Sequence, residues 1–405
     1  VLGYIPSPYS LYNEISKLPK SSYLEFDLTS RTSKLYTYQA DIPSVTSEED
    51  YAKLIERKVL DHLIADVPVG VFFSGGTDSS LIAAILHKNN INLETFSIGI
   101  DYKNDDKHYF KEISNYLKLK SHVYSFDSKE FDEVYDEVMD KMDEPTYDNS
   151  LFPTYFVSKK AAEKVKVVLS GEGGDEFFYG YPRSLVLQNM GSKRDYSITL
   201  LDRLFFLLPA FKSKNFLFLR LFEKVGQPMS YYILHMSPAR DCATLQQWKE
   251  VKKEFQRINV SPLGIDQEFY LENDLLRKTD FATSYVSIEG RVPLLDVDII
   301  GNAHHFENKK IERGVLKSFL KKILTRYLPE NMVYRNKSGF GLDMVKIFKN
   351  SSNIQADFDR ALSYLKNKGI SIKMPHARDV MMRKHPHYCF ALISLYRSIS
   401  NNESL

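Results

Sequence analysis

A short segment of the 405-residue chain, S-G-G-T-D-S-S at Ser74 to Ser80, combines the residue types that bind phosphate groups. Two consecutive glycines let backbone N–H groups approach a ligand closely, and Asp and Ser suit the start of a helix. The unpaired N–H groups and the dipole at a helix N-terminus both attract anions, so the segment predicts a phosphate-binding loop. No G-K-[ST] follows, as it would in a Walker A loop, so γ-phosphoryl transfer is not implied. The alternative is a tight strand-to-helix turn that binds nothing.

A second glycine-rich segment, S-G-E-G-G-D-E at Ser170 to Glu176, carries three carboxylates. Like the first segment it follows an apolar run, so both are expected to lie at the ends of buried strands. If the two loops meet, Asp78 and Asp175 make an oxygen site for Mg²⁺, which prefers carboxylates together with substrate phosphates. Such a site would neutralise the charge of bound phosphate groups, while N–H groups and hydroxyls of the first loop donate to them. An acidic turn that merely faces solvent is the alternative.

Strand and helix patterns alternate through the region that carries both loops. Apolar runs predict strands that begin at Val69 and span 93–100, 122–126 and 165–169, and helical spacing predicts helices at 47–65, 79–88, 107–119, 131–142 and 153–164. This alternation predicts an α/β fold with a doubly wound parallel sheet, in which ligands bind at the carboxyl ends of the strands. The first and fourth strands would therefore deliver their loops to the same crevice.

The remainder of the chain has other patterns. Segments 23–28 and 34–38 alternate as two strands do, and two strands alone are marginal in water. We expect them to be the last strands of a larger β layer. Aromatic and leucine residues at helical spacing in 182–275 predict several packed helices rather than a cofactor-binding element.

Composition narrows the class of protein. A net charge of +2 gives no reason to expect nucleic acid or an anionic membrane as a partner. The most apolar segment, 204–211, is too short to span a bilayer. Cys242 and Cys389 are expected to be thiols rather than a disulfide, and thiols suit the reducing cytoplasm. The pair His385 and His387 has no metal-ligand spacing on a regular element. The chain starts at Val1 rather than Met, so we expect a processed or cloned piece with any upstream domain outside it.

The chain resembles the asparagine synthetase family, whose synthetase domain is related to the ATP-pyrophosphatases. The resemblance covers nearly the whole chain, and its motifs occur in the family's order. They are S-G-G-T-D-S-S at Ser74, T-F-S-I-G at Thr95, D-E-P-T-Y-D-N-S at Asp143, L-S-G-E-G-G-D-E at Leu169, I-E-G-R-V-P-L-L-D at Ile288, G-V-L-K ending at Lys317, L-P at Leu328 and R-N-K-S-G-F at Arg335.

This resemblance implies a domain organisation and a reaction. Residues 1–40 would be a remnant of the family's N-terminal glutamine amidohydrolase domain, and 41–405 the synthetase domain with an added helical C-terminal part. The reaction would use ATP and Mg²⁺ to activate a carboxylate, the side chain of L-aspartate, as an acyl-adenylate. Ammonia then gives the amide, AMP and pyrophosphate. A glutamine amidohydrolase domain or subunit would be the partner, and a homodimer is compatible with the family.

The resemblance also assigns site residues. Nucleotide contacts would come from Phe72, Ser74, Gly75, Gly76, Asp78, Ser79, Ser80, Ile98, Ser170 and Gly171, and the metal ligands would be Asp78 and Asp175. Catalytic roles fall to Lys317, which would face the developing charge, and to Glu172, which would take a proton from ammonia or hold it in place. Glu289 matches a glutamate that assists the base in related lactam-forming synthetases.

Several alternatives stay open for individual residues and for the substrate. Lys317 lies among other lysines that are solvated, Phe72 and Ile98 are also ordinary strand residues, and Glu289 could form a structural ion pair with Arg291.

The identity of the acceptor carboxylate is also open, because Gly290 stands where the family often has alanine and the middle region is divergent. The acceptor could be a uronic acid or a peptide or lactam substrate. A tRNA-modifying or GMP-forming relative would lack the E-x-R-x-P-x-L-D motif, and a silent scaffold would have lost Asp78, Asp175 or Lys317.

Overall fold

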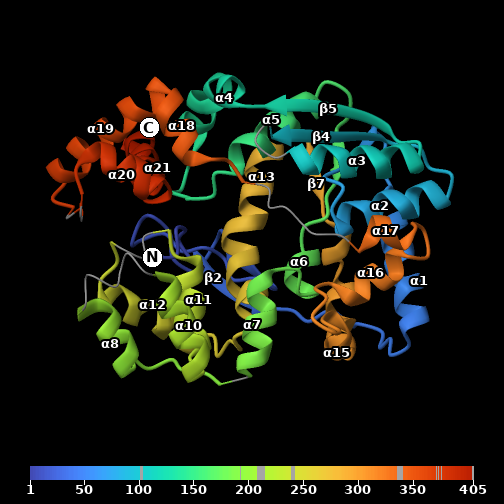
Figure 1. Ribbon diagram of the computed structural model, residues 1–405, viewed down its shortest axis with the longest axis horizontal. Coiled ribbons are helices and arrows are strands. Elements are labelled where there is room, and N and C mark those ends of the chain that lie inside the picture. Colours follow the sequence, from blue (N-terminus) through green and yellow to red (C-terminus); the bar gives the residue numbers. More distant parts are fainter. Residues whose placement is uncertain are drawn as a thin grey trace.

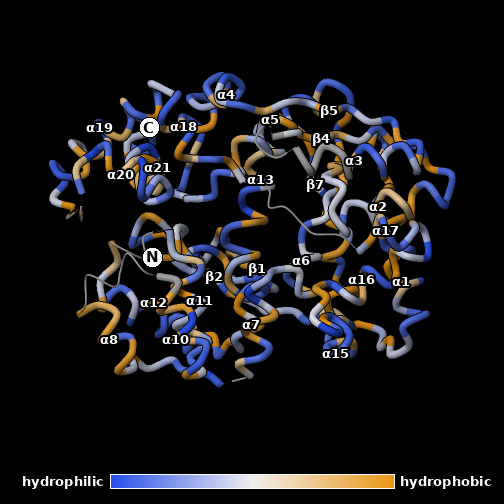
Figure 2. The backbone as a smooth tube through the Cα atoms, in the orientation of Figure 1, coloured by the Kyte–Doolittle hydropathy of each residue, from blue (hydrophilic) through white to orange (hydrophobic). Residues whose placement is uncertain are grey.

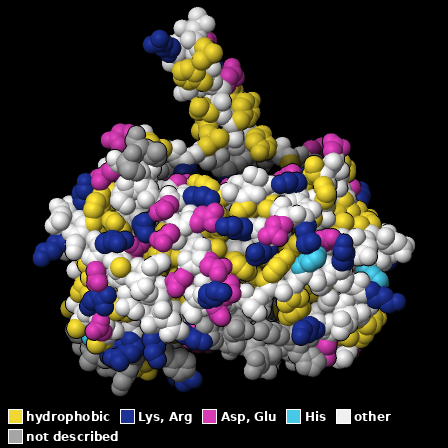
Figure 3. Space-filling view, turned by 90° about the horizontal axis from the view of Figure 1, so that it is seen from above, with side chains coloured by type: hydrophobic (Ala, Val, Ile, Leu, Met, Phe, Trp, Pro, Cys, Tyr) yellow, Lys and Arg dark blue, Asp and Glu magenta, His cyan; other side chains and the backbone are white. Residues whose placement is uncertain are grey.

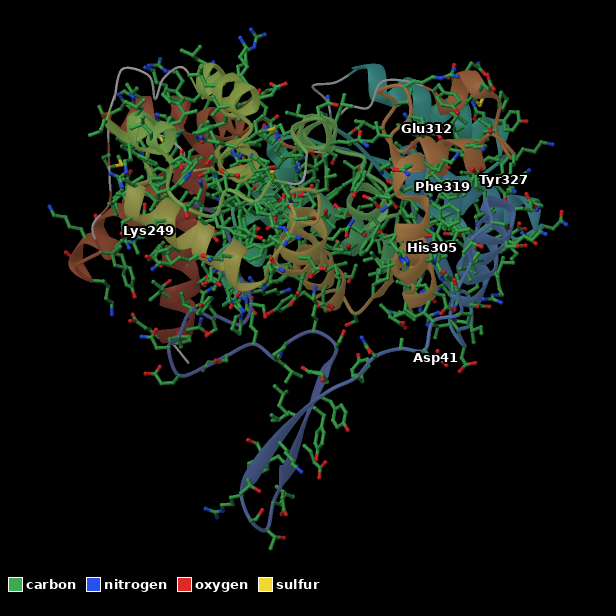
Figure 4. All side chains as sticks on the ribbon, turned by 90° about the horizontal axis from the view of Figure 1, so that it is seen from below. Asp41, Lys249, His305, Glu312, Phe319 and Tyr327 are labelled. Atoms are coloured by element: carbon green, nitrogen blue, oxygen red, sulfur yellow. The ribbon has the colours of Figure 1, made fainter. Side chains whose placement is uncertain are left out.

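The computed structural model has a sheet flanked by helices (Figure 1), and one hairpin projects from the body (Figure 4). It describes residues 1–100, 104–191, 193–207, 215–238, 242–334, 341–370, 372, 374 and 376–403, without the side chains of 100, 104–109, 215 and 216. The R-N-K-S-G-F motif therefore lies outside the described residues.

Five parallel strands form the central sheet in the order β5-β4-β3-β6-β7. Their bounds are β3 Val69–Phe72, β4 Glu94–Ile100, β5 Lys120–Phe126, β6 Val167–Leu169 and β7 Glu289–Arg291. The chain winds outward from β3 to β5 and then returns to the other side of β3, so the sheet is doubly wound, as predicted. Because β3 and β6 are direct neighbours, with Val71 opposite Leu169, the loops that follow them share one edge of the sheet.

Helices cover both faces of the sheet. On one face α1 (Glu48–Asp61), α2 (Thr77–Lys88), α3 (Asn104–Tyr116) and α16 (Ser318–Leu324) bury a core that includes Val71 and Leu169. On the other face α5 (Leu151–Ala161) packs against Phe96 and Val168, and α13 (Leu276–Ser284) lies beside α5 and β7. Alternate strand residues point to opposite faces, which explains why Val71 and Gly70 face different layers.

The segment that follows the second loop forms a separate helical layer. It contains α7 (Pro182–Met190), α8 (Leu200–Leu207), α10 (Asn215–Val225), α11 (Pro228–Met236), α12 (Leu245–Arg257) and a π-helix, η1 (Asp266–Leu275). Phe205, Phe222 and Trp248 are buried between these helices. The prediction of several packed helices in 182–275 is confirmed for the described residues.

The C-terminal part is helical, as expected. It comprises α17 (Glu330–Val333), α18 (Met344–Asn350), α19 (Ser352–Asn367), α20 (Arg378–Lys384) and α21 (Pro386–Glu403). Helices α18 and α21 pack on α4 (Ser128–Lys141), and α19 and α20 pack on α18 and α21. Hydrophilic residues predominate along α4 (Figure 2). Short helices complete the fold: α6 (Gly174–Phe177), α14 (Val297–Asn302), α15 (Glu307–Lys310) and the 3₁₀ turns η2 (Pro293–Leu295) and η3 (Ala303–Phe306).

The N-terminal strands β1 (Ser22–Asp27) and β2 (Thr32–Thr37) pair as an antiparallel hairpin that projects from the body, with hydrophobic side chains along it (Figure 3). Leu24 lies opposite Leu35, and both are half exposed. The residues before the hairpin pack against the body, because Leu2 and Tyr4 are buried against the helical layer formed by residues 182–275. The assignment of 1–40 to an amidohydrolase remnant stays a prediction.

Some boundaries differ from the sequence analysis. Strand β7 was not predicted, because three residues with a central glycine show no periodicity. Helix α1 ends at Asp61 rather than near 65, and α5 begins at Leu151, so Pro153 is its third residue. Cys242 and Cys389 are both buried and are not in a disulfide, which confirms the prediction of thiols. None of the helices among the described residues has both the length and the apolar character needed to cross a bilayer.

Candidate active site

The first loop connects β3 to the N-terminus of α2. Gly76 is the N-cap of α2 and has no side chain to cover the N–H groups of the first turn. Gly75 has φ +69°, and a Cβ there would lie 2.9 Å from the Cα of Phe110, so both the backbone angle and the space require glycine. Ser79 Oγ lies 3.1 Å from Ser74 Oγ, which joins the two ends of the loop. Ser80 is completely buried in α2.

The second loop lies directly against the first. A Cβ on Gly171 would be 2.9 Å from Cβ of Asp78 and 3.0 Å from N of Ser79, so the loops approach this closely only because residue 171 is glycine. Gly173, at φ +89°, caps the short helix α6, which begins with Gly174 and Asp175. The two glycine-rich segments therefore meet at one edge of the sheet, as the sequence predicted.

Lys317 joins the carboxylates of the two loops. Its Nζ atom contacts Asp78 and lies 2.7 Å from Oδ1 of Asp175, and the residue is 4% exposed. Burial opposes the charge on this amine, but Asp175 and Asp78 outweigh burial and raise the pKa of Lys317 above its ordinary value. Gly180 leaves the space that this contact needs, because a Cβ there would lie 2.8 Å from Cγ of Asp175 and would overlap Lys317.

The position of Lys317 is set by its backbone and by its helix. Lys317 has φ +54°, in the left-handed region, and precedes α16 as its N-cap. Phe319, labelled in Figure 4, is buried in α16 against Tyr51 and Phe306. A strained residue in front of an anchored helix is typical of functional positions. The solvated-lysine alternative for Lys317 is thereby contradicted.

The donor set fits MgATP. Two carboxylates, one from each loop, face the same point, and Mg²⁺ in nucleotide sites commonly uses one or two protein carboxylates plus phosphate oxygens. No group of three or more His, Cys, Asp or Glu residues that could hold a metal by itself occurs in the part of the chain that the structure describes. Asp78 and Asp175 could therefore hold a metal that is shared with phosphates.

Glu172 lies beside this cluster, and both of its carboxylate oxygens accept hydrogen bonds. Ser170 Oγ donates to Oε2, and Thr279 Oγ1 of α13 donates to Oε1 at 2.6 Å. The role of Ser170 as a nucleotide contact stays a prediction, and in this structure its hydroxyl donates to Glu172. Thr279 was missed by sequence reasoning, because its contact with Glu172 spans 107 positions and no motif links the two.

Glu289 does not join Glu172. It pairs with Val167 at the start of β6, whereas Glu172 follows the end of that strand. On β7 the Gly290 position faces Thr283 and Thr279 of α13, so Glu289 points to the opposite face from the helix that contacts Glu172. Its side chain is 59% exposed and accepts from Arg291 Nε at 2.7 Å, and this bond lowers the pKa of Glu289. The structure thus contains the ion pair that the sequence left as the alternative.

Phe72 and Ile98 occupy neighbouring strands. Both are partly buried against the core cluster that includes Phe96 and Val157. Ser97 Oγ donates to the carbonyl of Phe73, at the point where the first loop begins. Either reading of Phe72 and Ile98, as strand-core residues or as walls of a nucleotide site, agrees with these positions.

A doubly wound sheet with a glycine-rich loop at a helix N-terminus and a second, acidic loop at its switch point is the architecture of nucleotide-binding α/β proteins. The asparagine synthase family model matches residues 50–384, and the chain belongs to this family.

Curated relatives agree with this membership. Asparagine synthetase [glutamine-hydrolyzing] 1 of Bacillus subtilis is 27% identical over 378 residues, which are 86% of this chain and 59% of that protein. A Methanocaldococcus jannaschii protein, named provisionally as asparagine synthetase [glutamine-hydrolyzing] 2, is 43% identical over 44% of this chain and 36% of its own length. The chain thus spans about half the length of these relatives or less. The solved NMN synthetase of Francisella tularensis aligns with 59% of this chain and 94% of its own at 11% identity, with a TM-score of 0.26, too low to support an inference.

Proposed function

We propose that this chain is an ATP-dependent amide-forming synthetase, a carbon–nitrogen ligase. It activates the side-chain carboxylate of L-aspartate as an acyl-adenylate and then transfers ammonia, giving asparagine, AMP and pyrophosphate. The observation that carries the proposal is the contact of Lys317 with both Asp78 and Asp175, one from each glycine-rich loop. Family membership supports the same class of reaction.

The residues of the first loop act on the leaving group. Formation of the acyl-adenylate breaks the bond between the α- and β-phosphates, so negative charge develops on pyrophosphate. The N–H groups of the first turn of α2 and the hydroxyls of Ser74 and Ser79 are donors for that charge. Mg²⁺, held by Asp78 and Asp175, would supply further charge neutralisation.

Lys317 acts as a cationic donor at the same point. Its ammonium is already fixed by two carboxylates, so little reorganisation is needed when a phosphate oxygen approaches. Its raised pKa keeps it charged throughout the neutral range. Glu172 directly follows Gly171 in the second loop, and it accepts a proton from the attacking ammonia.

The ammonia would come from glutamine through an amidohydrolase partner. The relatives named above are described as glutamine-hydrolysing, and the chain spans part of their length. The exposed apolar residues of the hairpin, which are Leu24, Phe26, Leu28 and Leu35, suit a surface that such a domain covers. We assign the protein to the cytoplasm, a reducing compartment in which its two cysteines stay as thiols.

The test is a substrate panel. The purified chain is incubated with MgATP, ammonium and, separately, L-aspartate, L-glutamate, a uronic acid or a short peptide, and AMP, pyrophosphate and amide are measured. We expect stoichiometric AMP and asparagine with L-aspartate. Amide formation with the uronic acid or peptide instead would assign the chain to another branch of the family. Release of ADP rather than AMP would contradict the proposed adenylation.

A further inference from the structure

Hydroxyl groups from two separate elements hold the carboxylate of Glu172. Ser170, two residues earlier in the same loop, donates to one oxygen, and Thr279 of α13 donates to the other at 2.6 Å. An ionised carboxylate is an acceptor only, with about four lone-pair sites on its two oxygens. The two hydrogen bonds use one site on each oxygen, and a carboxylate has further lone-pair sites that can take a proton.

Thr279 is well fixed. It is 4% exposed and lies on α13, which packs between α5 and β7. One turn further, Thr283 Oγ1 donates to the carbonyl of Thr279 at 2.9 Å. The Thr279 hydroxyl has little freedom, because the side chain is buried, donates to Glu172 and has few rotamers in a helix.

The residue before Thr279 gives the same helix a charge beside Glu172. Lys278 donates to Ser150 Oγ at 3.1 Å and lies 3.5 Å from Asp148. Burial disfavours the charge on Lys278, but Asp148 and then Glu172 favour it, and the pKa of Lys278 is raised overall. Helix α13 therefore presents a hydroxyl and an ammonium to the region of Glu172.

We propose that Thr279 is a positioning residue that holds Glu172 in the orientation needed to accept a proton during amide formation. The inference rests on the proposed function, because it concerns the ammonia-dependent half of that reaction. In this step the C–N bond forms as ammonia attacks the acyl carbon, and the C–O bond to AMP breaks with its electron pair leaving on AMP. One proton passes from nitrogen to Glu172, so atoms and charge balance.

The two half-reactions allow a specific test. Carboxylate-dependent ATP–pyrophosphate exchange reports adenylation, which does not use Glu172, and ammonia-dependent amide formation reports the second step. The variants are Thr279→Val, which keeps the shape and removes the hydroxyl, and Thr279→Ser, which keeps the hydroxyl. Thr283→Val is the matched control, because this buried threonine lies on the same helix and bonds only backbone carbonyls in the described structure.

We expect Thr279→Val to lower kcat/KM for ammonia on the order of ten- to a hundredfold, less than loss of a general base itself. Exchange should change less than about threefold, and Thr279→Ser and Thr283→Val should both stay near wild type. Equal loss of exchange and amide formation in Thr279→Val would overturn the inference in favour of a structural role, and so would an unchanged amide step. Failure of the wild-type chain to catalyse exchange with any carboxylate would instead contradict the proposed function.

Discussion

The ammonium of Lys317 lies 2.7 Å from the carboxylate of Asp175, although the two residues are more than 140 positions apart in the sequence. Asp78, in the first turn of α2, contacts the same ammonium. Three charged and largely buried groups therefore depend on one another. Removing one partner of such a group leaves an uncompensated charge, so each substitution affects both the geometry and the electrostatics of the site.

Lys317→Ala should slow adenylation while nucleotide binding is largely retained. The ammonium would be lost as a preorganised donor to the developing charge, which typically costs about 10²–10³ in kcat. Carboxylate-dependent ATP–pyrophosphate exchange and equilibrium nucleotide binding measure the two effects separately. Lys322→Ala on the same helix is the control, because Lys322 is exposed and pairs with Glu48. Unchanged exchange in a destabilised Lys317→Ala protein would show that the lysine is structural.

Gly180→Ala tests the same site without removing a charge. The added Cβ would lie 2.8 Å from Cγ of Asp175 and would overlap Lys317, so one of the two must move. We expect exchange activity to fall at least tenfold, since small misplacement of catalytic groups is costly. Gly341→Ala is the control, because the nearest atom to its added Cβ would be 3.9 Å away. Activity equal to wild type in Gly180→Ala would mean that the Lys317–Asp175 geometry is not required.

The sequence predicted both loops and that they lie close together, because each loop contains glycines and directly follows an apolar run that predicts a strand. The parallel topology followed from alternating strand and helix patterns, and the structure confirms it. The sequence could not predict β7, because its three residues, E-G-R, have no strand periodicity. Nor could it assign Thr279 to Glu172, because that contact depends on how α13 docks against the sheet.

The case of Glu289 shows a second limit of sequence reasoning. A motif identifies a residue but not the face of the element to which its side chain points. Gly290 faces α13, and strand alternation then turns Glu289 the other way, toward Arg291. The Arg291 guanidinium also donates to the carbonyls of His62 and Ile64, so this pair secures β7 to the end of α1.

Gly3→Ala should destabilise the protein through the contact of the N-terminal segment with the loop before α5. Gly3 has φ +89°, its carbonyl accepts from the N–H of Tyr147 at 3.0 Å, and an added Cβ would overlap the Tyr147 ring. Strain of this kind costs about 1–3 kcal/mol. Gly369→Ala is the matched control, because Gly369 has φ +74° with no atom within 4 Å of the added Cβ. Equal losses of stability in urea unfolding would show that the Tyr147 contact contributes nothing.

Stability should depend on Glu137 at acid pH. Although burial raises the pKa of this carboxyl, hydrogen bonds from Lys159, Tyr155 and Lys141 outweigh burial and lower it to about 2. A lowered pKa in the folded state stabilises the fold above the ordinary pKa of 4.5, and this contribution is lost as the pH falls from 4.5 through about 2.

Glu137→Gln tests this dependence. The groups are partly exposed, so we expect wild type to exceed the variant by roughly 1 kcal/mol at pH 7 and the difference to shrink toward zero near pH 2. Urea unfolding at several pH values measures the difference. Glu133→Gln, at an exposed position with a long contact to Lys129, is the control. A difference that is constant with pH would contradict the assignment.

The last prediction concerns the source of nitrogen. The cysteines of the chain are Cys242 and Cys389, both buried, and burial raises the pKa of Cys389 to about 12. Neither is suited to act as the nucleophile that glutamine hydrolysis requires, because the thiolate is the reactive form of cysteine and burial disfavours it. The 405-residue chain assayed by itself should therefore form amide from ammonium salts and not from glutamine. The rate should rise as the pH approaches the pKa of ammonium, since NH₃ is the nucleophile.

Use of glutamine should return when an amidohydrolase domain is supplied, and the hairpin should be required for it. Leu24 and Phe26 are 54% and 52% exposed on one face of β1, where a covering domain would bury them. The double variant Leu24→Ser and Phe26→Ser should lose glutamine-dependent amide formation and keep the ammonium-dependent rate, whereas Tyr23→Ser on the opposite face should keep both. Release of glutamate from glutamine by the chain alone would refute the prediction, because a nucleophile within these residues would then have to exist.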